Sequence, residues 1–329
     1  MKNLISRQKI LNSAKMAAAA IGAVLAALAL KLDFSVSAGI VAILSIQPTK
    51  KETIRTGLSR FYAFVSALFI SFFCYKIFGF SNTAFFVYTG FFIVICQIFG
   101  WYSAIAMDSV LISHFILFGK MGFYELRNEI LLFAIGVGFG VLMNLFLKKN
   151  VPYIERLKKE ADRQIKYILH KMSKRILEPW AEPCDGKYFE LLDKAIFEAQ
   201  NAAMENYNNQ LGKKDVFDGE YISMRKEQRD ILLEIYKSLI DIKTVPSTAA
   251  LVSDFFEKVS VEYETKNDVR TLLKELQEIR ASMKEKPLPE NRAEFEDRAM
   301  LFVILKRMEE FLAIKRDFHS RFAEKLANL

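Results

Sequence analysis

The sequence predicts an all-α protein, with a six-helix transmembrane domain followed by a cytoplasmic α-helical bundle domain. Of the 329 residues, 52% are hydrophobic, and the long apolar segments all lie in residues 1–149. That part carries 14 Lys and Arg against 5 Asp and Glu, whereas residues 150–329 carry 32 against 33. In residues 150–329 apolar residues recur at spacings of three and four, which is typical of amphipathic helices.

The charge distribution excludes two classes of protein. A nucleic-acid-binding domain should carry its basic residues on a soluble module, but the net charge of +8 comes from the hydrophobic part of this chain. Three cysteines are too few, and odd in number, for a small disulfide-rich scaffold. We therefore expect membrane lipids, and no nucleic acid, among the partners.

Six apolar segments of the first domain are expected to be transmembrane helices, because about 20 apolar residues cross the hydrocarbon core. Their expected ranges are 14–32, 34–46, 61–80, 83–99, 102–119 and 130–147. The second has only 13 residues, so it is either a short span or a buried or re-entrant segment.

The positions of Lys and Arg in the short loops predict the orientation. With the N-terminus inside, the inner loops hold seven of these residues and the outer loops four, before the basic start of the second domain is added. Since cytoplasmic loops are enriched in Lys and Arg, both termini are expected in the cytoplasm of a multi-pass cell-membrane protein.

Prolines and glycines divide the second domain into expected helices. Pro152 stands where the first begins, and Pro179 and Pro183 end it. The further expected helices run over about 187–211, 219–242, 247–264, 266–285 and 291–327. Their apolar stripes predict the core of a helical bundle.

Two ionisable residues lie within the expected fifth span. A charged residue such as Asp108 is costly inside a membrane and often serves transport, although a hydrogen-bonded structural acid is equally consistent with the sequence. His114 follows six residues later, about 120° further around the helix. Neutral histidine is cheaper to bury than a carboxylate, so a packing role is favoured for His114.

Two other segments carry candidate residues. Residues 46–60 are polar and basic, and include Gln47, Arg55 and Arg60. A topology-setting loop is the simpler interpretation, and an anion-collecting site with Arg55 and Arg60 is the functional one. Gly136 and Gly140 have the GxxxG spacing that lets two membrane helices approach closely.

No catalytic, cofactor or metal-binding motif is present in the sequence, so we expect no enzyme.

A short motif at the end of the second span resembles the aromatic acid exporter superfamily, which includes fusaric acid resistance proteins. Gln47-Pro48-Thr49 is followed by a basic helix and then by Arg60-Phe61-Tyr62-Ala63-Phe64-Val65-Ser66-Ala67. The family pattern has Arg, two Gly and a Thr here. This sequence keeps Arg60 and has Ala63, Phe64 and Ala67 at the other positions. The layout is similar to a six-span bacterial branch with a C-terminal helical cytoplasmic domain.

This resemblance implies efflux of small aromatic carboxylic acids, coupled to the proton gradient, by a homodimer. Asp108 would then be the coupling carboxylate, and Arg55 and Arg60 would attract the anion. Trp101 and Tyr102 would stack on its ring, although aromatic residues at an interface are more often anchors. The alternative is a membrane-anchored scaffold or sensor whose helical domain binds a protein partner, since a minimal transporter does not need such a domain.

Overall fold

The computed structural model is all-α, as predicted. It describes residues 2–145, 151–180, 186–210, 212, 214–264 and 267–327, with side chains described for residue 10 and from residue 13 on. Within these ranges there are thirteen α-helices, one 3-10 helix and no strand. Pro183 and residues 146, 147, 211 and 266 of the expected helices lie outside the described residues.

The chain divides into two compact units. The first consists of Met1–Lys149 with Asn208–Lys214, and the second of Asn150–Tyr207 with Asp215–Leu329. We call them the N-terminal unit and the C-terminal unit.

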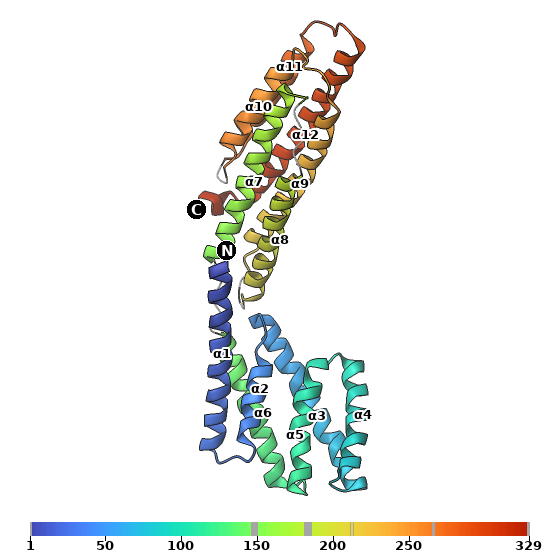
Figure 1. The fold of residues 1–329 in the computed structure, drawn as a ribbon. Coiled ribbons are helices and arrows are strands. Elements are labelled where there is room, and N and C mark those ends of the chain that lie inside the picture. Colours follow the sequence, from blue (N-terminus) through green and yellow to red (C-terminus); the bar gives the residue numbers. More distant parts are fainter. Residues whose placement is uncertain are drawn as a thin grey trace. The chain divides into compact units, whose positions relative to one another are not determined.

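The N-terminal unit contains six α-helices and one 3-10 turn (Figure 1). They are α1 (Lys2–Ala29), α2 (Ser35–Ser45), α3 (Lys50–Phe78), α4 (Asn82–Phe99), η1 (Tyr102–Ala104), α5 (Ile105–Phe118) and α6 (Phe123–Leu145). In the described contacts α1 packs against α2 and α6, while α4 packs against α3 and α5. Helices α1 and α4 therefore lie at opposite edges of the unit.

Besides α1, which starts at Lys2 rather than at residue 14, two helices begin earlier than the apolar segments suggest. Thr49 caps α3, since its side chain accepts a hydrogen bond from the Glu52 backbone N–H at 3.3 Å. The basic residues 50–60 therefore form the first turns of α3. Helix α6 starts at Phe123, seven residues before the expected sixth span. Polar residues near the start of each helix thus enter the interior of the unit.

Close packing of α6 on α2 depends on two glycines. A Cβ atom on Gly136 would lie 2.5 Å from the Val41 side chain, and one on Gly140 would lie 2.6 Å from Ser45 Cβ. These separations leave no room for a larger residue, so the two backbones approach at the GxxxG positions.

Three described helices are long and apolar enough to cross a membrane, namely α3, α4 and α6. Three further apolar stretches, Ser13–Ala29, Ser35–Ser45 and Tyr102–Phe118, are shorter. The six expected segments thus all lie in apolar helices, and their number of full crossings stays a prediction.

The C-terminal unit is a bundle of six long helices with a short seventh (Figure 1). They are α7 (Val151–Leu177), α8 (Lys187–Asn208), α9 (Phe217–Asp241), α10 (Ala249–Glu262), α11 (Arg270–Lys284), α12 (Arg292–Arg321) and α13 (Ala323–Ala327). One apolar core joins residues from all of them. The expected helix 291–327 is interrupted at Phe322, which leaves the helical conformation with φ −120° and ψ 24°.

A buried polar network lies inside this apolar core. The fully buried Arg225 donates hydrogen bonds to Tyr221 at 2.8 Å and Gln228 at 2.8 Å, and forms an ion pair with Asp162 at 2.8 Å. Its guanidinium also donates to the Tyr263 hydroxyl. The ion pair and hydrogen bonds compensate the cost of burying this charge.

A second cation, Lys315, is buried against the same network. Its ammonium lies 3.9 Å from the centre of the Tyr263 ring and donates a hydrogen bond to the Glu264 carbonyl. Burial and the nearby Arg225 charge lower the pKa of Lys315 from 10.5 to about 6. The unfolded chain therefore binds one more proton than the folded chain between these two pH values, and stability should rise with pH across that window.

We expect Lys315→Met to remove this pH dependence. The wild-type contribution is at most about 1.4 kcal/mol of unfolding free energy per pH unit. The measurement is urea unfolding of the full chain in mild detergent at several pH values, with the exposed Lys306→Met on the same helix as control. An equal slope for Lys315→Met and wild type would contradict the assignment.

Candidate functional site

The buried carboxylate of Asp108 is the starting point of the site. Asp108 lies in the first turn of α5 and is completely buried. Neither of its carboxylate oxygens has a hydrogen-bond partner among the described residues. Most buried polar groups in proteins are hydrogen-bonded, and a charge inside a membrane costs at least about 2.5–3.5 kcal/mol on insertion scales. This carboxylate therefore lacks the partners that a structural acid would have.

Arg60 supplies the opposite charge. It lies on α3, is 3% exposed, and donates a hydrogen bond from Nη1 to Ser45 Oγ at 3.0 Å. Ser45 in turn donates to the Val41 carbonyl at 2.7 Å, which fixes its hydroxyl. The charges of Arg60 and Asp108 interact through the interior without a hydrogen bond between them, and Arg60 Nε has no hydrogen-bond partner. The guanidinium thus retains a donor for a further acceptor.

Two hydroxyl groups complete what we call the Asp108 cluster, formed by Arg60, Tyr88, Asp108 and Ser109. The Tyr88 hydroxyl lies beside Ser109 and within electrostatic reach of Asp108. In the described part of the N-terminal unit, every buried side-chain N or O atom without a hydrogen-bond partner belongs to these four residues. The unsatisfied polar groups are therefore gathered in one place, contributed by α3, α4 and α5.

A second polar group of residues surrounds His114, about 9 Å further along α5 by its sequence distance. His114 Nδ1 lies 2.9 Å from Glu129 Oε2 on α6, and its Nε2 lies 3.3 Å from Ser37 Oγ. Glu129 also accepts a hydrogen bond from Asn128 Nδ2 at 3.1 Å. Phe34 stacks on the imidazole at 4.1 Å. In contrast to Asp108, both titratable groups here have close partners.

Apolar side chains lie between the Asp108 cluster and the polar residues around His114 along α5. Phe64, one turn beyond Arg60, stacks on Phe133, one turn beyond Glu129, with ring centres 4.4 Å apart. Leu111 lies between Asp108 and His114 on α5 and belongs to the same buried cluster.

The remaining candidate residues lie apart from Asp108. Arg55 is exposed on α3, so the two arginines do not form one site. The backbone carbonyl of Gln47 accepts a hydrogen bond from Asn144 Nδ2 at 2.6 Å, which links the end of α2 to α6. Trp101 stacks on Phe99 at 4.8 Å, and Tyr102 is 58% exposed. This arrangement is typical of aromatic anchors at a membrane interface.

Several residues at these positions were not predicted from the sequence. Glu129 stands one residue before the expected sixth span and therefore falls outside it. Tyr88 and Ser45 resemble ordinary residues of apolar helices. A signal existed for Glu129, because α6 also carries Asn128 and a polar pair at the start of a span often faces the interior. Nothing comparable marks Tyr88.

Within the described ranges, no group of three or more His, Cys, Asp or Glu side chains is placed to hold a metal ion.

Comparisons with known proteins agree with this division into two units. The family described as aromatic acid exporter family member 1 matches residues 9–147, and the aromatic acid exporter C-terminal domain matches residues 153–316. The uncharacterized protein YqjA of Bacillus subtilis (strain 168) is 27% identical over 299 residues, which cover 90% of this chain and 92% of YqjA. A crystal structure of a protein from Clostridium difficile 630 is 30% identical, and covers 51% of this chain and 99% of that one at a TM-score of 0.45.

The two family matches lie in succession and together extend over most of the sequence. The chain therefore belongs to the aromatic acid exporter family of membrane transporters.

Proposed function

We propose that this protein exports small aromatic carboxylic acids across the cell membrane and that the transport is coupled to protons. The observation that supports this most is the unpartnered, fully buried carboxylate of Asp108 close to the buried Arg60. Membership of the exporter family supports transport over the alternatives of a scaffold and an enzyme.

Arg60 is the proposed binding group for the substrate anion. Its guanidinium presents planar donors that suit a carboxylate, and one of them has no partner in this state. Ser45 holds the other end of the group through the hydrogen bond at 3.0 Å. Arg60 is therefore positioned in advance, which lowers the entropic cost of binding.

Asp108 is the proposed proton carrier. The substrate carboxylate and an ionised Asp108 compete for the one positive charge of Arg60. If both were ionised at once, one negative charge would remain uncompensated in the interior, which is costly. Binding of the anion is therefore linked to protonation of Asp108, so the anion and one proton cross in the same direction. The rate of efflux then depends on the pH gradient, while the outward concentration gradient of the acid drives export.

The apolar layer of Phe64, Leu111 and Phe133 is the proposed barrier on the transport path. Leu111 lies between Asp108 and His114 along α5, and Phe64 and Phe133 stack within the same buried apolar cluster. Alternating access requires this layer to open after the substrate is bound. The aromatic stack also offers a surface of the right chemistry for the substrate ring.

The outer faces of the helices are proposed to contact lipid and, over part of their area, a second copy of the chain. Exposed apolar side chains on α3 and α4 include Phe61, Phe69, Phe72, Phe86 and Phe91. We propose a homodimer with both termini in the cytoplasm. Crosslinking with mass measurement in mild detergent should give twice the chain mass, and a monomer would contradict it.

We expect Asp108→Asn to abolish the dependence of efflux on the pH gradient, because asparagine cannot exchange a proton. The measurement is efflux of labelled 4-hydroxybenzoate from proteoliposomes with and without an imposed pH gradient. Glu129→Gln is the matched control, since it removes another fully buried carboxylate that has His114 and Asn128 as partners.

Efflux by the Glu129→Gln control should still depend on the pH gradient. Gradient-dependent efflux by Asp108→Asn at the wild-type rate would contradict the role of Asp108. Equal loss in both variants would show that any buried carboxylate is needed for folding, and would also count against a specific role.

We expect Arg60→Gln to weaken apparent affinity for 4-hydroxybenzoate by roughly 10- to 100-fold, since a hydrogen bond to a charged group contributes about 1.5–3 kcal/mol. Arg55→Gln is the control, because it removes the same charge from an exposed position of the same helix. The concentration dependence of flux for both variants checks this. A similar effect at both positions would favour a general surface-charge effect instead.

A further inference from the structure

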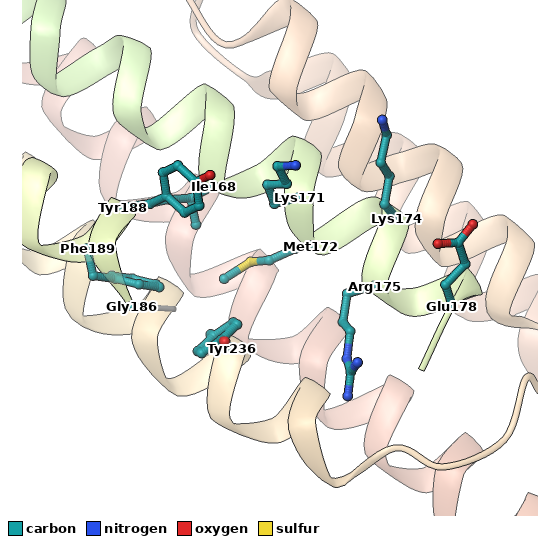
Figure 2. A pocket seen from close by; sticks show the side chains of 10 residues that line it. All are labelled: Ile168, Lys171, Met172, Lys174, Arg175, Glu178, Gly186, Tyr188, Phe189 and Tyr236. Carbon is teal, nitrogen blue, oxygen red and sulfur yellow. The ribbon is translucent and has the colours of Figure 1, made fainter. Parts of the chain in front are cut away.

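The C-terminal unit contains a pocket that transport in the N-terminal unit does not use. It has a volume of about 190 Å³ and lies between the end of α7, the start of α8 and the last turns of α9. Figure 2 shows the side chains that line it, with Met172 from α7, Phe189 from α8 and Tyr236 from α9 directed toward one another. Three helices thus contribute its apolar walls.

The apolar walls are held in place by the bundle core. Met172 is 2% exposed and Phe189 is 8% exposed, and both belong to the core of the unit. The rings of Phe189 and Tyr236 lie 5.7 Å apart at an angle of 50°. Because these side chains are already packed, the pocket is preformed, and a ligand would order few of its walls on binding.

The rim of the pocket is basic. Among the described lining residues, Lys171, Lys174 and Arg175 come from α7, and Glu178 is the one acidic residue. Met172 and Arg175 are three positions apart, so they share one face of the helix. Basic residues at the end of a helix also offset its dipole, but the dipole does not account for an aromatic pocket beneath them.

Volume and lining together select the class of ligand. Pockets for drug-sized ligands have volumes of about 300–1,000 Å³, so this one admits a single ring with a small substituent. Aromatic and thioether side chains pack well against a flat ring. The described lining residues carry three positive charges and one negative charge, which favours an anionic substituent, and a carboxylate matches the planar guanidinium of Arg175.

We propose that this pocket binds a single-ring aromatic carboxylate, with the ring among Met172, Phe189 and Tyr236 and the carboxylate at Arg175. The site lies wholly within the C-terminal unit. It does not depend on the transport proposed for the N-terminal unit, and it gives the protein a second place to detect the same class of molecule.

The test is equilibrium dialysis of labelled 4-hydroxybenzoate with the full chain in mild detergent, in an Arg60→Gln background. That background weakens the proposed transport site, so the remaining binding reports on the pocket. We expect saturable binding that Arg175→Gln weakens by about tenfold or more. Lys159→Gln, an exposed cation on the same helix, should leave it unchanged.

Two competition experiments need no further variant of the pocket. Unlabelled benzoate should displace the probe at least about tenfold better than benzamide, which has the same ring without the charge. A three-ring carboxylic acid should not compete, because it exceeds the volume of the pocket.

Absence of saturable binding in the Arg60→Gln background would overturn the proposal. So would binding that Arg175→Gln leaves unchanged, or equal competition by benzamide and benzoate. Loss of proton-coupled flux in the variants of the N-terminal unit would leave this result untouched, so the two proposals fail separately.

Discussion

The N-terminal unit is organised around one constraint, the burial of a carboxylate that nothing in its surroundings satisfies. Asp108 is fully buried and its oxygens lack hydrogen-bond partners among the described residues. Such a group is tolerated only if it is protonated or if another partner arrives during function. The nearby Arg60, anchored by Ser45, provides a charge that Asp108 and a substrate anion can use in turn. Binding and protonation are thereby linked in the proposed account.

Other buried charges in the molecule make the contrast clear. Glu129 has His114 and Asn128 within hydrogen-bond distance, and Arg225 in the C-terminal unit has an ion pair and several hydrogen bonds. These groups have the partners expected of structural charges. Lys315 stands between the two cases, because its ammonium is held by a ring and a carbonyl while burial lowers its pKa. The number of partners thus separates structural charges from the proposed functional one.

The sequence predicts the all-α fold from apolar periodicity and marks Asp108 as an ionisable residue in an apolar run, both of which are local signals. Arg60 is a candidate only through the basic segment 46–60 and the family motif. The sequence did not predict that Arg60 would be buried and Arg55 exposed, because that depends on how α3 packs. The sequence does not mark Glu129 as an interior residue. The apolar segment begins at residue 130, and hydropathy alone does not show that α6 begins seven residues earlier, at Phe123. Arg225 and Lys315 look like residues of a solvated helix face, and only the assembled bundle buries them.

Proton uptake on substrate binding tests the central claim most directly. The full chain in weakly buffered detergent solution would be mixed with 4-hydroxybenzoate and the pH change recorded, across the range in which protein carboxyl groups titrate. Competition for Arg60 predicts uptake that reaches up to about one proton per bound anion within that range, and none for Asp108→Asn. Equal uptake by wild type and Asp108→Asn, or binding by wild type without any uptake across the range, would contradict the account.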